Sequence, residues 1–301
     1  MKFIEYIFIK VIWNIFSLFP FSIRVKVSQC LSAGLFSIFK KNTKLIDKNL
    51  RASIPGKTND WYEKTVKKNI QYLGRFFSEF IHMSSMKAKF IDKTVVSEPD
   101  EAGIKEYFKD GGIIILGHLG NWEWHGSRIG RWLGDRFYVL AKRQSNKWSN
   151  ALIERNRSRQ HMKTVYTDQS TFKIISLLRK KNTLCFVADQ FAGGEAPVFE
   201  FFGRRAATYL GPAMAARVSK SRVFFAHSHH KDGKLHVVID PLKTPDVDPK
   251  KDPEKWDRQM TDIWLRRLEE CVVKYPEEYF WVHDRWKVTR LMRLEENPGK
   301  D

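Results

Sequence analysis

The sequence predicts an α/β protein with a largely parallel, mixed sheet covered by helices on both faces. The chain has 301 residues, of which 43% are hydrophobic, and this supplies a sizeable core for one large domain. Apolar runs such as 113–116 and 184–188 lack period-two alternation, which is typical of strands buried on both faces. Segments of helical periodicity separate these runs, and that order predicts a parallel sheet.

The expected elements follow one another without a repeat or a long linker. A long helix is expected over 59–86, beginning at Asn59 or Asp60. The final helix begins at Asp252-Pro253-Glu254 and ends before Pro276. Between them we expect strands over 113–116, 137–141, 184–188, 223–227 and 235–239, and helices over 122–133, 148–161, 172–179 and 212–218.

The N-terminal stretch "MKFIEYIFIKVIWNIFSLFPF" is rich in Ile and Phe but carries Glu5, Lys10 and Asn14. It shows no clear signal-peptide cleavage site. It is just long enough to span a bilayer core, where its charges would be costly, and residues 23–39 are typical of an interfacial segment. We therefore predict a membrane-associated helical segment over 1–40 and a single α/β domain over 41–301. Spanning and lying in the interface both stay open, and a buried helical hairpin is the alternative.

The chain is strongly basic. It has 53 Lys and Arg against 34 Asp and Glu, a net charge of +19, and such a field attracts nucleic acid, anionic membranes, phosphorylated substrates or acidic proteins. A nucleic-acid-binding protein would need a reading module or a basic-aromatic platform. The basic residues are instead spread over the whole chain, so we predict no nucleic-acid partner. The three isolated cysteines are typical of reduced thiols packed as small apolar groups.

The segment "GGIIILGHLGNWEWHG" places His118 and Glu123 where a strand passes into a helix. Five residues apart, they would lie about 140° apart on a helix and on opposite faces of a strand. They converge only if the chain bends, and Gly117 and Gly120 permit a bend. Asn121 is placed to cap the following helix.

This position is chemically favourable, because sites in open α/β sheets form at the carboxyl ends of strands. A carboxylate in the first helical turn stays ionised, and one that holds one imidazole nitrogen leaves the other free to take a proton. We therefore predict that His118 and Glu123 form a general-base dyad, a structural histidine at a strand end being the alternative. His125 lies nearby, but no HExxH or clustered Cys and His supports a metal site.

A base without a protein nucleophile beside it suggests that the nucleophile is a substrate hydroxyl, and the electrophile must then be bound nearby. Candidate anion-binding residues are Lys142 and Arg143 in "AKRQSNKW", and the arginines of "RNRSRQ". Each alone is also consistent with a solvated helix face. Asp189-Gln190 ends another expected strand.

The sequence carries an ordered set of motifs: H-x4-E from His118 to Glu123, Arg143, "RNR" ending at Arg157, Asp189-Gln190, "FFG-x4-T" from Phe201 to Thr208, Gly211-Pro212 and "YFWVHDRWK". Taken together, these motifs resemble the late acyltransferases of lipid A biosynthesis, the secondary lauroyl and myristoyl transferases of Gram-negative bacteria. The resemblance extends to about Lys287. The related glycerol-phosphate acyltransferases usually carry Asp in the dyad and an F-P-E-G-[ST] block, and neither occurs here.

The resemblance implies an acyltransferase-like α/β fold and an O-acyltransferase that uses an acyl thioester. His118 would deprotonate a hydroxyl of a lipid A precursor with Glu123 orienting the imidazole, and acyl-acyl carrier protein would be the donor, with no metal or redox cofactor. It also implies an inner-membrane protein whose active site faces the cytoplasm. The alternative is an acyltransferase of the same fold that acts on a different membrane lipid or glycolipid. The implied substrate-binding residues are Arg143, Arg157, Asp189, Gln190 and Thr208.

Overall fold

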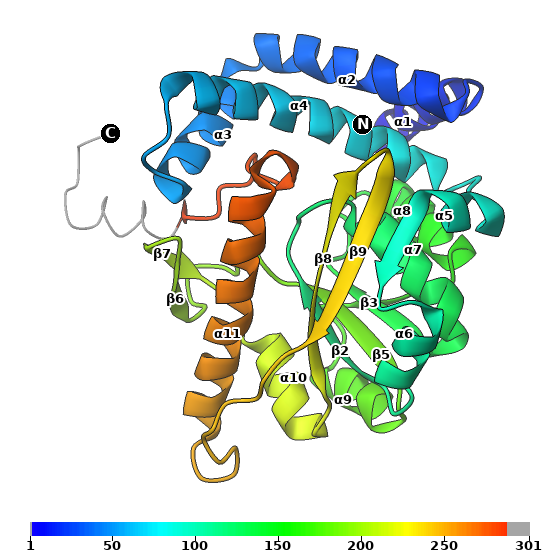
Figure 1. The fold of residues 1–301 in the computed structure, drawn as a ribbon. Helices are drawn as coiled ribbons and strands as arrows, with labels where there is room; N and C mark the ends of the chain where they lie inside the picture. Colours follow the sequence, from blue (N-terminus) through cyan, green and yellow to red (C-terminus); the bar gives the residue numbers. More distant parts are fainter. Residues whose placement is uncertain (1, 288–301) are drawn as a thin grey trace.

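The structure is a computed structural model that describes residues 2–287 (Figure 1). Its centre is a sheet with the strand order β1-β9-β8-β2-β5-β3-β4, and β6 and β7 form a separate hairpin. The strands of the sheet are β1 (Val95–Glu98), β2 (Gly112–Leu116), β3 (Phe137–Ala141), β4 (Lys163–Tyr166), β5 (Thr183–Val187), β8 (Val223–Lys231) and β9 (Lys234–Pro241). The hairpin consists of β6 (Val198–Phe201) and β7 (Arg204–Ala207).

The helices surround this sheet on both faces. The N-terminal helices are α1 (Lys2–Ser17), α2 (Phe21–Ile38), α3 (Lys40–Ser53) and α4 (Asn59–His82). The others are α5 (Ala88–Thr94), α6 (Glu101–Tyr107), α7 (Trp122–Leu133), α8 (Lys147–Arg159), α9 (Thr171–Arg179), α10 (Gly211–Ser219) and α11 (Pro253–Lys274).

The sheet is mostly parallel, as the sequence predicts. Strand β2 pairs in parallel with both β5 and β8, and β3 pairs in parallel with β4 and β5. The exception is the antiparallel hairpin of β8 and β9, which turns through Asp232 and Gly233, both with positive φ. The sheet is therefore mixed.

Strand β2 explains why its sequence is apolar throughout. Ile113 and Ile115 belong to the core on the α9, α10 and α11 side, whereas Ile114 and Leu116 belong to the core on the α6 and α7 side. Neighbouring residues of a strand point to opposite faces, so a strand covered on both sides has no polar position. This confirms the expected coverage of both faces.

Several elements differ from the expectation. The helix expected over 59–86 ends at His82, where Met83–Met86 form a turn. The short strands β1, β4, β6 and β7 and the helices α3, α5 and α6 were not expected, because each is too short or too polar to show a clear period.

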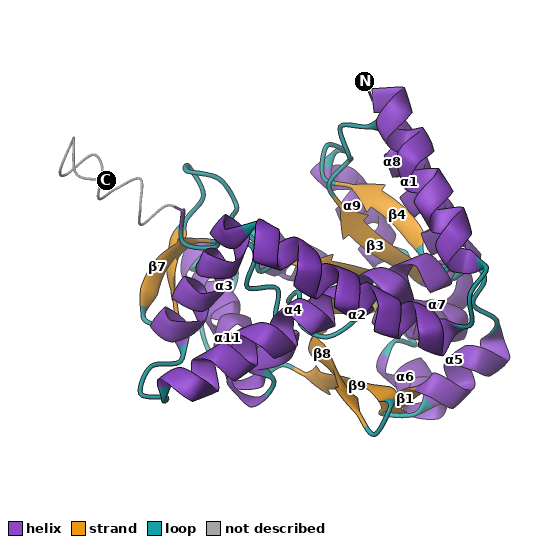
Figure 2. Ribbon diagram, turned by 90° about the horizontal axis from the view of Figure 1, so that it is seen from above, coloured by secondary structure: helices purple, strands orange, loops and turns teal. Residues whose placement is uncertain are grey.

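The N-terminal helices lie together at one end of the molecule, with α2 along α4 (Figures 1 and 2). Helix α2 turns Arg24, Ser28 and Ser32 inward. A Cβ at Gly74 of α4 would lie 2.4 Å from the Ser28 carbonyl oxygen, so the two backbones approach closely here.

The outward faces of both helices are apolar and exposed, so they do not form a buried hairpin. On α1, and just beyond its end, the exposed residues are Phe3, Ile7, Val11, Ile15 and Leu18. On α2 and its end they are Ile23, Val27, Leu31, Leu35 and Ile38. Within residues 2–287, no helix has both the length and the apolar character needed to cross a bilayer.

Candidate active site

The turn between β2 and α7 depends on two glycines for different reasons. Gly120 has φ +63°, and a Cβ there would lie 2.0 Å from the carbonyl oxygen of Ser228. Gly117 does not have positive φ, but a Cβ on it would meet the Leu268 side chain at 2.6 Å. The expected bend is therefore present, with Gly120 supplying the left-handed conformation and Gly117 the space. Asn121 caps α7, as expected, by accepting hydrogen bonds from the next turn's backbone.

The carboxylate that holds His118 is Asp189. Its Oδ1 lies 2.5 Å from Nδ1 of His118, and its Oδ2 accepts a 3.0 Å hydrogen bond from the His118 backbone N–H. The two residues lie 71 positions apart but meet because β2 and β5 are adjacent parallel strands that end at the same edge of the sheet. The prediction that Glu123 orients the imidazole therefore differs from this structure.

Asp189 is buried and ionised. Burial acts to raise the pKa of Asp189, but the charge and hydrogen bonds of His118, with a hydrogen bond from Tyr279, outweigh it and lower the pKa to about 2. An ionised carboxylate only accepts hydrogen bonds, so the proton between the two side chains belongs to Nδ1 of His118. The other ring nitrogen, Nε2, is then left as the proton acceptor.

Glu123 points instead toward α8. Its two carboxylate oxygens accept hydrogen bonds from Arg157, at 3.1 Å from Nε and 2.5 Å from Nη2. Burial acts to lower the pKa of Arg157, but the charge of Glu123 outweighs it and raises the pKa. The two side chains form a bidentate, buried ion pair that links α7 to α8. Glu123 and Arg157, which the sequence predicts to have separate roles in the site, therefore bind each other.

A C-terminal segment, residues 279–286, supports the catalytic turn. The Phe280 backbone N–H donates to the His118 carbonyl oxygen at 3.0 Å. His283 Nε2 accepts from the Phe191 backbone N–H at 3.0 Å, just beyond Asp189 and Gln190. Asn49 of α3 holds the segment through the carbonyl oxygens of Trp281 and His283. The motif "YFWVHDRWK" signals this region, but the sequence alone assigned it no role.

Thr208 belongs to this support. It is fully buried, and its Oγ1 accepts a 2.6 Å hydrogen bond from Nη2 of Arg285. Arg285, itself buried, also donates to the Ala207 carbonyl oxygen. Thr208 therefore fixes a buried arginine in this structure, and its expected contact with a substrate stays a prediction.

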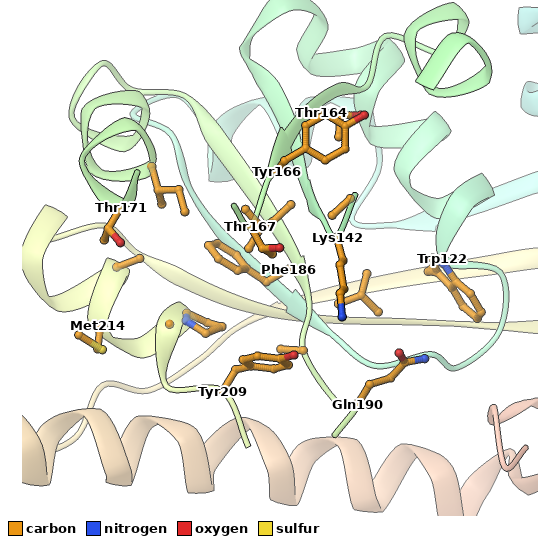
Figure 3. A pocket seen from close by; sticks show the side chains of 18 of the residues that line it. Trp122, Lys142, Thr164, Tyr166, Thr167, Thr171, Phe186, Gln190, Tyr209 and Met214 are labelled. Atoms are coloured by element: carbon orange, nitrogen blue, oxygen red, sulfur yellow. The ribbon is translucent and has the colours of Figure 1, made fainter. Parts of the chain in front are cut away.

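His118 lines a cavity of about 750 Å³. The walls are largely apolar, and the side chains named in Figure 3 include Trp122, Phe186, Tyr209 and Met214. Gln190 also lines the cavity near Trp122. The ring of Trp122 lies 4.6 Å from that of His118, so the imidazole has aromatic surroundings on the cavity side.

Of the expected substrate-binding residues, Arg157 and Gln190 line this cavity. Asp189 lies behind His118, and Arg143 is turned away. Nε of Arg143 donates to Asp168 at 2.9 Å, and its guanidinium stacks 3.8 Å from the centre of the Tyr166 ring. The cation that lines the cavity at this point is its neighbour Lys142. Among residues 2–287, no group of three His, Cys, Asp or Glu could hold a metal ion.

An imidazole base beside an apolar cavity of this size suits an enzyme that acts on a substrate with an apolar chain, such as an acyltransferase. The chain belongs to the bacterial lipid A biosynthesis acyltransferase family, whose model matches residues 2–288. It is 25% identical over 299 residues to the lipid A biosynthesis lauroyltransferase of Escherichia coli (strain K12), covering 93% of this chain and 90% of that relative. The protein is therefore an enzyme that transfers acyl groups in lipid A biosynthesis.

Proposed function

We propose that the protein transfers a fatty acyl chain from acyl-acyl carrier protein to a hydroxyl of a lipid A precursor. Nε2 of His118 takes the proton of that hydroxyl, and the alkoxide oxygen forms a bond to the thioester carbonyl carbon. The carbon–sulfur bond then breaks, and the carrier thiol leaves with the proton from the imidazolium. Asp189 holds the ring and stabilises its positive charge during the transfer.

The observation that carries this proposal is the position of His118. One ring nitrogen is bound by a buried carboxylate, and the residue lines an apolar cavity. Apolar walls favour an acyl chain because each buried methylene contributes about 0.8 kcal/mol. The family match supplies the lipid A context. The net charge of +19 suits an acidic carrier protein and an anionic acceptor.

The test compares the lipid A of cells that lack this protein with that of cells carrying the wild type or His118→Ala. We expect mass spectrometry to show one additional acyl chain only with the wild type. Purified protein should transfer acyl groups from the carrier-protein thioester to the isolated precursor. Unchanged lipid A, together with acylation of a different membrane lipid, would instead establish the alternative acceptor.

We further propose that the exposed apolar faces of α1 and α2 lie in the interface of the inner membrane, with the active site on the cytoplasmic side. Helix α2 supports this placement because Arg24, Ser28 and Ser32 point inward, whereas Ile23, Val27, Leu31 and Leu35 are exposed. This is the reverse of a surface helix in water. An apolar face of this size also marks an interaction surface. Basic residues such as Lys10 and Lys26 would contact anionic head groups.

Sedimentation with vesicles of anionic phospholipid tests the membrane proposal. Leu31 of α2 is 51% exposed, and Val273 of α11 is 53% exposed, so Leu31→Glu and Val273→Glu make a matched pair. We expect Leu31→Glu to weaken vesicle binding and Val273→Glu to leave it near wild type. Equal binding by the two variants would place the membrane contact elsewhere.

A further inference from the structure

Three cations line the cavity, and they differ in what they bind. They are Lys142, Arg157 and Arg179. Arg157 is held by Glu123. Arg179 ends α9 just before β5 begins, so it lies toward the edge of the sheet opposite His118. Lys142 follows the last residue of β3, which places it at the same edge as His118.

The side chain of Lys142 enters the cavity. Figure 3 shows its amino group extending toward the side of the cavity that Gln190 lines, and Gln190 directly follows Asp189 in the chain. Strands β2, β5 and β3 are neighbours, so two inter-strand spacings, roughly 10 Å, separate the ends of β2 and β3. Among residues 2–287, no hydrogen bond or ion pair engages the Lys142 ammonium, which is solvent-exposed at the cavity mouth.

The neighbouring Arg143 is engaged by other side chains, in contrast to Lys142. Arg143 is neutralised by Asp168 and packed on Tyr166. Glu154 also lines the cavity, but its Oε2 accepts a 3.2 Å hydrogen bond from the Tyr166 hydroxyl, and among the described residues no ion pair joins it to Lys142. An ammonium without an ion-pair partner beside apolar walls attracts an anion more strongly than it would in bulk water.

We propose that Lys142 binds a phosphate group of a substrate and so positions that substrate against His118. The inference rests on the proposed acyl transfer for the identity of the substrates. Two sources share this chemistry: a phosphate of the glycolipid acceptor, and the phosphodiester of the prosthetic group that carries the donor thioester. In both cases the ammonium acts as a point charge at the cavity mouth.

The experiment measures kcat and KM of Lys142→Met, which keeps the length of the side chain and removes its charge. Lys163→Met is the matched control, because Lys163 on β4 is paired with Asp135, does not line the cavity and loses the same charge. We expect Lys142→Met to raise the KM of one phosphate-bearing substrate about ten- to a hundredfold. Its kcat should stay within about twofold of wild type, Lys142→Arg should recover most of the loss, and the control should match wild type.

Substrates without phosphate identify the source. If the acceptor phosphate is bound, the effect should disappear with a dephosphorylated acceptor. If the donor phosphodiester is bound, it should disappear with an acyl-N-acetylcysteamine thioester. An unchanged KM would overturn the proposal. A fall in kcat that is the same for every substrate would also overturn it, because such a fall indicates that Lys142 stabilises the oxyanion of the reaction instead of a phosphate.

A direct binding measurement separates this inference from the proposed function. Calorimetry with glucosamine 1-phosphate and with 4′-phosphopantetheine needs no turnover. We expect wild type to bind one probe more tightly than its dephosphorylated form and Lys142→Met to lose that preference. If the wild type transfers no acyl chain, the proposed function fails. The preference of the wild type for the phosphorylated probe would still show whether Lys142 binds phosphate. Probe binding that Lys142→Met leaves unchanged would overturn the inference even in an active enzyme.

Discussion

Within residues 2–287, two histidines pair with carboxylates, His118 and His230, and His118 is the one that suits catalysis. His118 binds Asp189 through Nδ1 and lines the cavity. His230 of β8 lies between Glu278, 2.9 Å from its Nδ1, and Glu79, 3.0 Å from its Nε2. Both nitrogens of His230 are therefore occupied. The comparison teaches that a neighbouring carboxylate does not by itself identify a base, because the base also needs a nitrogen left for the substrate.

The electrostatics of the second cluster support this distinction. Burial acts to lower the pKa of His230, but Glu79 and Glu278 outweigh it and raise the pKa to about 9. Burial likewise acts to raise the pKa of Glu79, but His230 and Arg75 lower it to about 2. The cluster is thus a charged, buried junction between α4, β8 and the turn at Glu278. It also reaches the catalytic turn, because Asn121 donates to Glu79 at 2.6 Å.

The largest expected effect is on turnover by His118→Ala. Removing a general base should lower kcat at least about 10²–10⁴-fold, and circular dichroism should show an unchanged fold. The comparison variant is His230→Gln, whose folded fraction should keep kcat within about tenfold of wild type. If steady-state assays gave the two variants equal losses, the assignment of His118 as the base would fail.

The next largest effect distinguishes the roles of Asp189 and Glu123, the two carboxylates near His118. Asp189→Asn should lower kcat about 10²–10⁴-fold, because a neutral amide neither fixes the tautomer nor stabilises the imidazolium. Glu123→Gln should cost less in kcat and more in stability, because Glu123 pairs with Arg157 rather than with His118. Steady-state kinetics with urea unfolding measures both. A larger kcat loss for Glu123→Gln would restore the dyad predicted from the sequence.

A smaller effect concerns the free energy of unfolding of His230→Gln. The change leaves Glu79 and Glu278 without their shared cation, so we expect a loss of about 3–5 kcal/mol. Urea titration measures it. Lys64→Gln, which removes an exposed ion pair with Asp60, is the control and should cost no more than about 1 kcal/mol. A cost for His230→Gln as small as that of the control would show that the cluster is not structural.

The smallest effect is a pH dependence. The pKa of His230 is about 9 in the folded protein against an ordinary value of 6.5, so the folded state binds this proton more tightly. The stabilisation is complete below about pH 6.5 and is lost as the pH rises through about 9. Urea unfolding between pH 6 and 10 should show that the free energy of unfolding falls more steeply with pH for the wild type than for His230→Gln. Parallel curves for the two proteins would contradict the raised pKa.

Much of the fold could be predicted from the sequence, because β2 and β5 are continuous apolar runs and α7 has a clear N-cap at Asn121. The base itself could also be predicted, since His118 follows an apolar strand and precedes Asn121. Its partner could not. Asp189 was recognised at a strand end, but the adjacency of β2 and β5 is a property of strand order, which local periods do not encode.

The choice between Lys142 and Arg143 was similarly beyond the sequence. Both are basic and follow β3 directly. Which one enters the cavity depends on the direction of each side chain at the strand end and on Asp168 and Tyr166, which capture Arg143. Arg157 and Glu123 were expected to have separate roles, and only their packing in space makes them partners.

The support of the catalytic turn by residues 279–286 also sets an order of events during synthesis. About 160 residues separate His118 from Phe280, whose backbone holds it. At roughly 5–20 residues per second on the ribosome, the base is made about 10–30 s before the segment that secures it. A nascent chain that already contains His118, Asp189 and the cavity walls therefore still lacks a finished site, and acylation begins only after translation has passed the C-terminal motif.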